Sequence, residues 1–188
     1  MGKNIKIHKL ILGEIKENCY IIEIDGNAII IDPGQNPQKI GRFLKDNCLI
    51  PKIILLTHAH YDHAYSVKYL QKKGAKCYVH AADAEKLEGN GIMEEFFEKP
   101  FPRTKTDDLL SEKEYDFFGL NIKVLHTPGH TSGSCCFIIE NELFSGDTLF
   151  DNGYGRCDLV DGDFNKMKQS LRKLKPYYRL PRHPGHSY

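Results

Sequence analysis

Residues 53–63 read Ile53-Ile54-Leu55-Leu56-Thr57-His58-Ala59-His60-Tyr61-Asp62-His63, an apolar run that is followed directly by three histidines and an aspartate. The run Ile53–Leu56 predicts a strand that is buried on both faces. In an extended segment residues two apart point the same way, so His58 and His60 can grip one ion together. Asp62 and His63 lie on the turn that follows and can face a neighbouring ion. Because imidazole nitrogen and carboxylate oxygen are ligands of zinc, the stretch predicts a metal site rather than a chance group of surface histidines.

Three later segments offer further ligands, each after a strand-like stretch and each with a glycine directly before the ligand. They are His130 in Thr127-Pro128-Gly129-His130-Thr131, Asp147 in Ser145-Gly146-Asp147-Thr148, and His186 in Pro184-Gly185-His186. A glycine lets the backbone turn sharply and swing the next side chain into a shared cleft. We therefore expect side chains from four segments to meet in one cleft.

The composition is that of an ordinary soluble globular protein, with 40% hydrophobic and 27% charged residues among 188. This length predicts one well-packed domain over residues 1–188. The formal net charge of +1 gives no case for nucleic acid or a membrane, so a small-molecule substrate is expected. No apolar run approaches the roughly 20 residues of a transmembrane helix, and the start lacks a signal peptide's apolar core. Six cysteines without a C-x-x-C pair then indicate reduced thiols in a cytoplasmic protein. The oligomeric state stays open.

Apolar patterning divides the chain into strands and helices. In the first half we expect strands at Ile5–Leu12, Cys19–Ile24, Ala28–Ile31, Ile53–Leu56 and Ala75–Val79, and helices at Gln38–Asn47, Ala64–Lys73 and Ala81–Leu87. Gly89–Asp108 is expected to be irregular, and a loop of this length is often a substrate lid. The second half predicts strands at Tyr115–Phe118, Ile122–His126, Ser134–Ile139 and Glu142–Phe144, a helix at Asp163–Leu174 and an extended segment at Tyr178–His186. This pattern of strands followed by helices occurs in both halves of the chain. It predicts an α/β (α+β) fold, which is a four-layer αββα sandwich of two mixed sheets with outer helices.

The motifs H-x-H-x-D-H, T-P-G-H-T, S-G-D-T-L-F and P-G-H, in this order, resemble those of the metallo-β-lactamase fold superfamily, over nearly the whole chain. Within it the chain is similar to the glyoxalase II-like (hydroxyacylglutathione hydrolase-like) branch. The resemblance implies seven ligands around two divalent metal ions: His58, His60 and His130 for the first, Asp62, His63 and His186 for the second, and Asp147 as the bridge.

The ligand set also separates the chain from other branches that it resembles. True β-lactamases commonly lack the histidine found here at His63 and often have a cysteine where Asp147 stands. Flavodiiron-type relatives have a glutamate where His60 stands. Neither departure is present in this sequence.

The activity that the resemblance implies is hydrolysis of a thioester or a related small ester by a metal-bound hydroxide. Two cations lower the pKa of a shared water, and Asp62 is the expected catalytic residue that orients the nucleophile and relays a proton. Zinc is the expected metal, with iron and manganese as alternatives. Glyoxalase II resembles this domain plus a C-terminal helical segment that binds glutathione. We expect no such domain here, so the exact substrate stays open.

Two other functions use the same residues. Persulfide dioxygenases resemble this fold and its Gly155-Arg156-Cys157-Asp158 stretch, and they hold a mononuclear iron through two histidines and an aspartate. Metal identity and stoichiometry distinguish that alternative from the hydrolase. A nuclease of the same superfamily would need a basic patch, which the near-neutral charge does not supply.

Residues beside the ligands are candidates for supporting roles, and each has an ordinary structural alternative. Thr57 and Thr131 could orient imidazoles or be turn residues, and Asp32 could pair with a ligand histidine or cap its turn. The remaining expectations are an ion pair between Arg156 and Asp158, a place in the cleft wall or in packing for Tyr154, and core or surface positions for His8, His80, His126 and His183.

Overall fold

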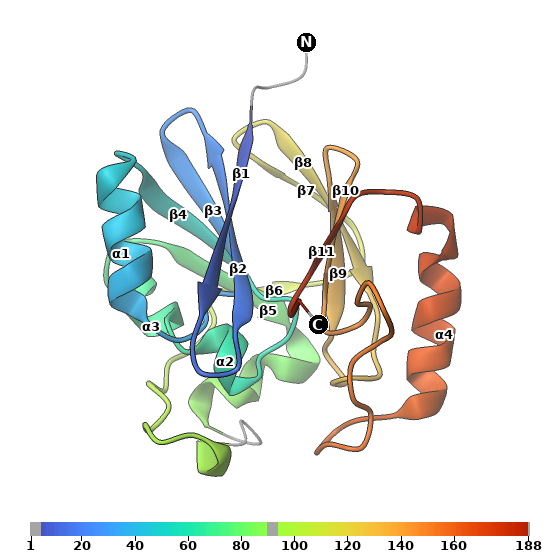
Figure 1. Ribbon diagram of the computed structural model, residues 1–188. Coiled ribbons are helices and arrows are strands. Elements are labelled where there is room, and N and C mark those ends of the chain that lie inside the picture. Colours follow the sequence, from blue (N-terminus) through green and yellow to red (C-terminus); the bar gives the residue numbers. More distant parts are fainter. Residues whose placement is uncertain (1–4, 90–93, 188) are drawn as a thin grey trace.

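The computed structural model describes residues 5–89 and 94–187. The described residues up to Leu110 contain a six-stranded mixed sheet (Figure 1). Its strands lie in chain order: β1 (Lys6–Leu12), β2 (Glu17–Ile24), β3 (Asn27–Ile31), β4 (Ile50–Leu55), β5 (Lys76–His80) and β6 (Asp108–Leu110). β1, β2 and β3 pair antiparallel through short turns. β3 to β6 pair parallel, because longer crossovers carry the chain back between them. The crossovers contain α1 (Pro37–Asp46), α2 (Tyr61–Ala64) and α3 (Val67–Gln71).

A five-stranded sheet follows, in the order β11-β10-β9-β8-β7. Its antiparallel part consists of β7 (Glu114–Phe117), β8 (Leu120–His126), β9 (Cys135–Ile139) and β10 (Glu142–Gly146). The chain then forms α4 (Phe164–Leu174) and the 3-10 turn η3 (Lys175–Tyr177), and β11 (Arg182–Pro184) pairs parallel to β10. α4 begins at Asp163, whose carboxylate accepts hydrogen bonds from the Asn165 and Lys166 backbone N–H groups.

The core lies in three apolar layers. Between the sheets, Ile22 and Ile29 of the first sheet pack in one cluster with Ile122 and Phe137 of the second. A second layer joins the outer face of the first sheet to α1 and α3, and a third joins the outer face of the second sheet to α4. Figure 1 shows α1 and α4 on opposite sides of the paired sheets. The predicted four-layer αββα sandwich is therefore confirmed.

The helix predicted at Ala64–Lys73 is wrong as a single element. α2 ends at Ala64, and α3 begins only at Val67. The cause lies at Ser66, whose backbone N–H donates to the Pro33 carbonyl at 2.9 Å and whose hydroxyl donates to the Gly34 carbonyl. These bonds tie the chain to the loop after β3, so they replace the helical hydrogen bond that a continuous helix needs at this point.

Three other expectations need correction. The segment predicted as a helix at Ala81–Leu87 is the 3-10 helix η1 (Ala81–Glu88). The irregular stretch Gly89–Asp108 contains the 3-10 turn η2 (Glu94–Phe96) and the first residue of β6, while residues 90–93 lie outside the described part. The extended segment predicted at Tyr178–His186 has only the three residues of β11 as strand. Such short elements contain too few residues for a periodic pattern.

Among the described residues, no helix combines the length and the apolar character that crossing a membrane requires. The six cysteines are free thiols, and four of them (Cys19, Cys77, Cys135 and Cys136) are buried.

Candidate metal centre

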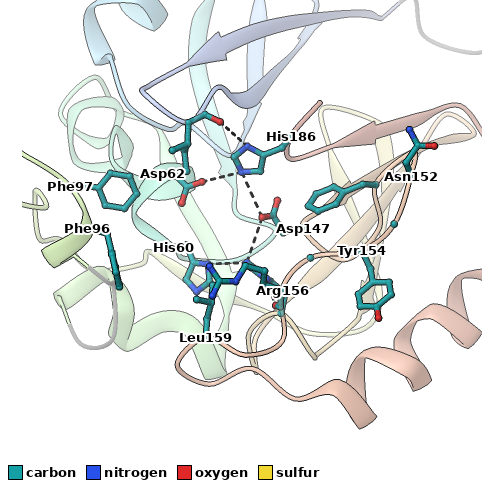
Figure 2. Close-up of a pocket in the computed structure, with 15 residues that line it drawn as sticks. His60, Asp62, Phe96, Phe97, Asp147, Asn152, Tyr154, Arg156, Leu159 and His186 are labelled. Carbon is teal, nitrogen blue, oxygen red and sulfur yellow. Dashed lines mark hydrogen bonds and ion pairs between the residues drawn. The ribbon is translucent and has the colours of Figure 1, made fainter. Parts of the chain in front are cut away.

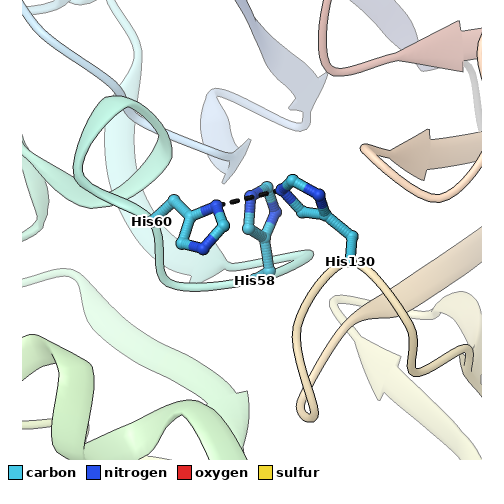
Figure 3. Close-up of side chains that lie close together, drawn as sticks. All are labelled: His58, His60 and His130. Carbon is cyan, nitrogen blue, oxygen red and sulfur yellow. Dashed lines mark hydrogen bonds between the residues drawn. The ribbon is translucent and has the colours of Figure 1, made fainter. Parts of the chain in front are cut away.

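Three histidines from two loops form one cluster at the end of the sheets. His58 and His60 lie between β4 and α2, and His130 lies between β8 and β9. Their rings stand edge to face with centroids 4.6 to 4.7 Å apart, and His130 Nε2 lies 2.9 Å from His60 Nδ1. Figure 3 shows the three rings converging on one point. Ligand atoms of all three lie within 4.8 Å of one another, as a shared metal ion requires.

A second cluster lies directly beside the first. Asp62 and His63 come from the first turn of α2, and His186 comes from the segment after β11. Asp62 Oδ2 lies 3.2 Å from the Nε2 atoms of both histidines. Figure 2 shows Asp62 and His186 facing each other across the floor of a cavity.

Asp147 lies between the two clusters. Its Oδ1 is 3.5 Å from His63 Nε2, and its Oδ2 is 3.6 Å from His130 Nε2 and 3.7 Å from His186 Nε2. Gly146, directly before it, has a φ of +48°, and a Cβ there would lie 2.3 Å from Thr57 Oγ1. A larger residue at 146 would therefore displace the loop that carries Asp147, as the glycine-before-ligand pattern predicts.

Hydrogen bonds on the outer side of four rings fix how the histidines are oriented. His63 Nδ1 donates to Asp32 Oδ2 at 3.0 Å. His130 Nδ1 donates to the Arg156 carbonyl at 2.8 Å, and His186 Nδ1 donates to the Ile15 carbonyl at 3.2 Å. Because Nδ1 is the atom that faces outward in each of these bonds, the Nε2 atoms point toward the centre.

The fourth ring is oriented through a threonine. The Thr57 hydroxyl donates a hydrogen bond to Asp32 Oδ2 at 2.6 Å. Its oxygen therefore accepts a hydrogen bond from His58 Nδ1 at 3.1 Å. Asp32 Oδ1 also accepts from the Thr57 backbone N–H at 2.7 Å. Asp32 lies near enough to His58 and His63 to form a third group of potential ligands. Both of its oxygens are already used, however, so it supports the ligands rather than joining them.

The inward atoms fit divalent cations. Among the described residues, the buried side-chain atoms without a hydrogen-bond partner include Nε2 of His58, His60 and His63 and Oδ1 of Asp147. Buried nitrogen and carboxylate oxygen atoms without a hydrogen-bond partner are unfavourable, above all when they face one another. A cation bound between them would supply the missing partner. Nitrogen and carboxylate donors in this mixture suit zinc, iron or manganese.

The pKa values of the ligand side chains are shifted by burial and by the charges of neighbouring ligands. Burial, together with neighbouring histidines, lowers the pKa of His58 and His60 well below the ordinary value. Burial would raise the pKa of Asp62, but His63 and His186 outweigh it and hold that pKa low. Burial would lower the pKa of His63, but the carboxylates of Asp62 and Asp147 outweigh it and raise that pKa. Without metal, a proton on His63 thus takes the place of a cation, and metal binding releases it.

Asp83, in η1, links the two loops that supply the first cluster. Its fully buried carboxylate accepts from the Ala59 backbone N–H at 2.9 Å, from Thr131 Oγ1 at 2.9 Å and from the Gly133 backbone N–H at 3.0 Å. Lys86 completes the group with its Nζ 2.6 Å from Asp83 Oδ1. Residues three apart eclipse in a 3-10 helix, so η1 places Asp83 and Lys86 on one face. Asp83 therefore fixes the separation of the loops that carry His60 and His130.

A cavity of about 620 Å³ opens above the centre (Figure 2). Five of the seven predicted ligands line its floor: His60, Asp62, His130, Asp147 and His186. Its walls come from the turn after β1, from the segment around η2 and from the loop after β10. Phe97 stacks on Tyr61 at 4.0 Å, and the Tyr61 hydroxyl donates to the Lys99 carbonyl at 2.7 Å. The described part of the predicted lid is thus anchored to the ligand-bearing segment.

The other expected site residues have mixed outcomes. Thr57 contacts a ligand imidazole as anticipated, whereas Thr131 contacts Asp83 and Ser134 instead. Arg156 and Asp158 form the expected ion pair, with two 2.9 Å contacts. Tyr154 lines the cavity. The four other histidines have partners away from the centre: His8 with Glu23, His80 with His126, His126 with the Ser132 carbonyl, and His183 with Glu142.

Two buried acids escaped the sequence analysis. Asp83 lies in a segment without a recognisable motif, and apart from Lys86 its partners are 24 to 50 residues away in the chain. Glu17, at the start of β2, is also fully buried, and among the described residues neither of its carboxylate oxygens has a hydrogen-bond partner. Burial raises the pKa of Glu17 well above its ordinary value. No local pattern predicts either position, because both depend on contacts between distant segments.

The αββα sandwich and the paired His/Asp clusters define a protein with a candidate divalent-metal site at the end of two packed sheets. The chain belongs to the metallo-beta-lactamase superfamily, whose family model matches residues 12–186. A similar curated protein is the "Probable metallo-hydrolase YqgX" of Bacillus subtilis (strain 168), 32% identical over 191 residues that cover 95% of this chain and 87% of YqgX.

Two solved structures are also similar over most of the chain. The BLEG-1 B3 metallo-beta-lactamase has a TM-score of 0.89 and 33% identity, covering 97% of this chain and 92% of that one. TTHA1623, whose crystal structure is in a di-iron-bound form, has a TM-score of 0.84 and 34% identity, covering 96% of this chain and 92% of that one.

Proposed function

We propose that the protein is a metal-dependent hydrolase that cleaves a thioester or a related small ester, as glyoxalase II-like enzymes do. The observation that carries the proposal is the position of Asp147 between two complete ligand clusters on the floor of one cavity. This arrangement is suited to two ions that share one bridging carboxylate. The cavity volume is within the range of small-molecule sites, so we propose a small-molecule substrate and no nucleic-acid partner.

The chain's own residues would prepare this reaction. His58, His60 and His130 would hold one divalent ion, and Asp62, His63 and His186 the other. When bound, such ions lower the pKa of a water and polarise a carbonyl oxygen. Asp62 is ionised at neutral pH, because neighbouring histidines keep its pKa low, so it accepts a proton rather than donating one. Asp32 fixes the ring of His63, and Phe97 helps exclude bulk water from the cavity.

Zinc is the metal that we propose first, with iron and manganese as alternatives. All three accept imidazole and carboxylate ligands. The di-iron form of TTHA1623 supports iron as a candidate, because that protein is similar over nearly the whole chain.

The test measures metal content and turnover in the same preparations. Purified protein is loaded with zinc, iron or manganese, and metal is counted per chain while thiol release is followed on a thioester panel. We expect two metals per chain and hydrolysis in the wild type. His60→Ala and Asp62→Ala should each lower the metal content and abolish hydrolysis. His126→Ala is the matched control, because His126 bonds to the Ser132 carbonyl outside the centre, and it should keep both properties.

Three outcomes would contradict the proposal. A metal-free Asp62→Ala protein with full activity would remove the role of the centre. One iron per chain with oxygen uptake on glutathione persulfide would favour the dioxygenase. Hydrolysis of a β-lactam without hydrolysis of any thioester or ester would favour a β-lactamase activity, as the name of BLEG-1 indicates for that protein.

A further inference from the structure

We infer that the substrate carries an uncharged apolar group, of at least several carbon atoms, next to the bond that is cleaved. The inference rests on the proposed function and narrows its substrate class. It is carried by the walls of the cavity, which differ in character from the ligand-lined floor.

The walls are largely apolar and come from three separate segments. They are formed by Ile15, Phe96, Phe97, Phe150, Tyr154 and Leu159. Figure 2 shows Phe96 and Phe97 on one side of the metal centre and Tyr154 on the other. A ligand that reaches the centre must therefore pass between aromatic side chains.

Several of these side chains are exposed although they are large and apolar. Phe96 is 70% exposed, Ile15 46% and Tyr154 45%. These exposed apolar side chains lie around one opening and are not scattered over the surface. Such a cluster is typical of a site that binds an apolar ligand. Burial of these side chains against a ligand would remove apolar area from water and contribute to binding.

The charges of the walls disfavour an anionic substrate. Among the described residues that line the cavity, Arg156 is the only lysine or arginine. Its guanidinium makes two 2.9 Å contacts with the Asp158 carboxylate, which neutralises it. Recognition of carboxylates or phosphates normally uses free arginine or lysine side chains. A substrate body with carboxylate groups, such as a glutathione moiety, therefore meets no lysine or arginine without a carboxylate partner among the described residues of these walls.

The apolar group could belong to the acyl part or to the leaving thiol, and two substrate series distinguish them. The first keeps N-acetylcysteamine as the thiol and lengthens the acyl chain from acetyl to hexanoyl. The second keeps an acetyl group and lengthens an alkyl thiol over the same range. A methylene that is fully buried changes binding about fourfold, so over four methylenes we expect kcat/KM to rise at least about tenfold in one series. Succinyl in place of butyryl, or glutathione in place of N-acetylcysteamine, should give no gain.

Variants connect the preference to the walls. In the series that shows the rise, Phe96→Ala and Ile15→Ala should each reduce the ratio of long-chain to short-chain kcat/KM severalfold. Leu109→Ala is the matched control, because Leu109 is 47% exposed on β6 and does not line the cavity. It should leave the ratio unchanged.

A binding measurement separates failure of this inference from failure of the proposed function. Titration calorimetry with S-hexyl- and S-methyl-N-acetylcysteamine, which are thioethers and cannot be hydrolysed, is performed on metal-free and metal-loaded protein. Tighter binding of the hexyl compound supports the apolar walls even if no thioester is cleaved, which would refute only the hydrolase. Equal binding of both compounds, a flat chain-length dependence in both series, or a preference for succinyl or glutathione substrates would overturn the inference.

Discussion

Removing the Asp83 carboxylate should disrupt the first metal cluster without touching a ligand. Four donors converge on this side chain: the backbone N–H groups of Ala59 and Gly133, the hydroxyl of Thr131 and the ammonium of Lys86. Asp83→Ala leaves all four without this acceptor. Asp83→Asn keeps the volume and one carbonyl oxygen but removes the negative charge.

The expected magnitude follows from burial. The Lys86 side chain is only 7% exposed, and burial would lower its pKa, but Asp83 outweighs burial and raises it. Removing one partner of a buried ion pair costs about 3–5 kcal/mol, and an unpaired buried N–H costs roughly 1–3 kcal/mol. Because these costs overlap, we expect Asp83→Ala to lower the free energy of unfolding by about 5 kcal/mol, and Asp83→Asn by about 2–3 kcal/mol. The first value is comparable to the whole stability of many domains.

Urea unfolding of the metal-free protein measures this loss, and metal titration reports the effect on the centre. In Asp83→Asn, the metal affinity of the first cluster should fall, because His60 and His130 belong to it. The metal affinity of the second cluster should fall less. Asp161→Ala is the control, because Asp161 is the other carboxylate that contacts Lys86, at 2.9 Å, and is 31% exposed. It should cost less than Asp83→Asn, about 1 kcal/mol, because the Asp161 carboxylate is partly exposed to water whereas that of Asp83 is fully buried. Equal losses in Asp83→Asn and Asp161→Ala, or an unchanged first metal, would refute the reasoning.

Two further perturbations act on other parts of the centre. Burial raises the pKa of Glu17 in the folded protein above about 4.5, so above that pH the unfolded state binds fewer protons and the wild type loses stability as pH rises. The free energy of unfolding of Glu17→Gln should therefore exceed that of the metal-free wild type, and the difference should grow from about pH 5 upward by at most about 1.4 kcal/mol per pH unit. Urea unfolding at several pH values measures this difference, and a difference that does not vary with pH would contradict the prediction. His186→Ala should retain one metal per chain by elemental analysis, because the first cluster stays complete; retention of two metals would exclude His186 as a ligand.

The predictable part of the centre is the part that is local in the chain. His58, His60, Asp62 and His63 fall within six residues, and the period of an extended segment already places two of them together. The later ligand His130 could be predicted as well, because a glycine precedes it after a strand-like stretch. The sandwich could be predicted from strand and helix patterning, since the central strands are apolar on both faces and the outer helices on one.

The unpredicted part depends on segments that meet only after folding. Asp83 reads as an ordinary acid among alanines, and its role appears only when η1 packs against the loops after β4 and β8. The cavity walls bring Ile15 together with Phe96 and Phe150, which are far apart in the sequence. The break at Ser66 is likewise set by two carbonyl oxygens from the loop after β3. No period in the sequence records such contacts.

The last ligand shows why the centre requires both sheets. Gly185 accepts from the Asn18 backbone N–H at 2.7 Å, and its own N–H donates to the Gly146 carbonyl at 2.9 Å, so this segment bridges β2 and β10. The Asn18 amide and the Tyr20 hydroxyl both donate to the Pro184 carbonyl, at 2.9 and 2.7 Å. A Cβ at Gly185 would lie 2.2 Å from Asp147 Oδ1, so only glycine allows this approach. Because these contacts place His186 only when the two sheets are packed together, an ion at the second cluster would bind the folded state alone and stabilise the sandwich by mass action.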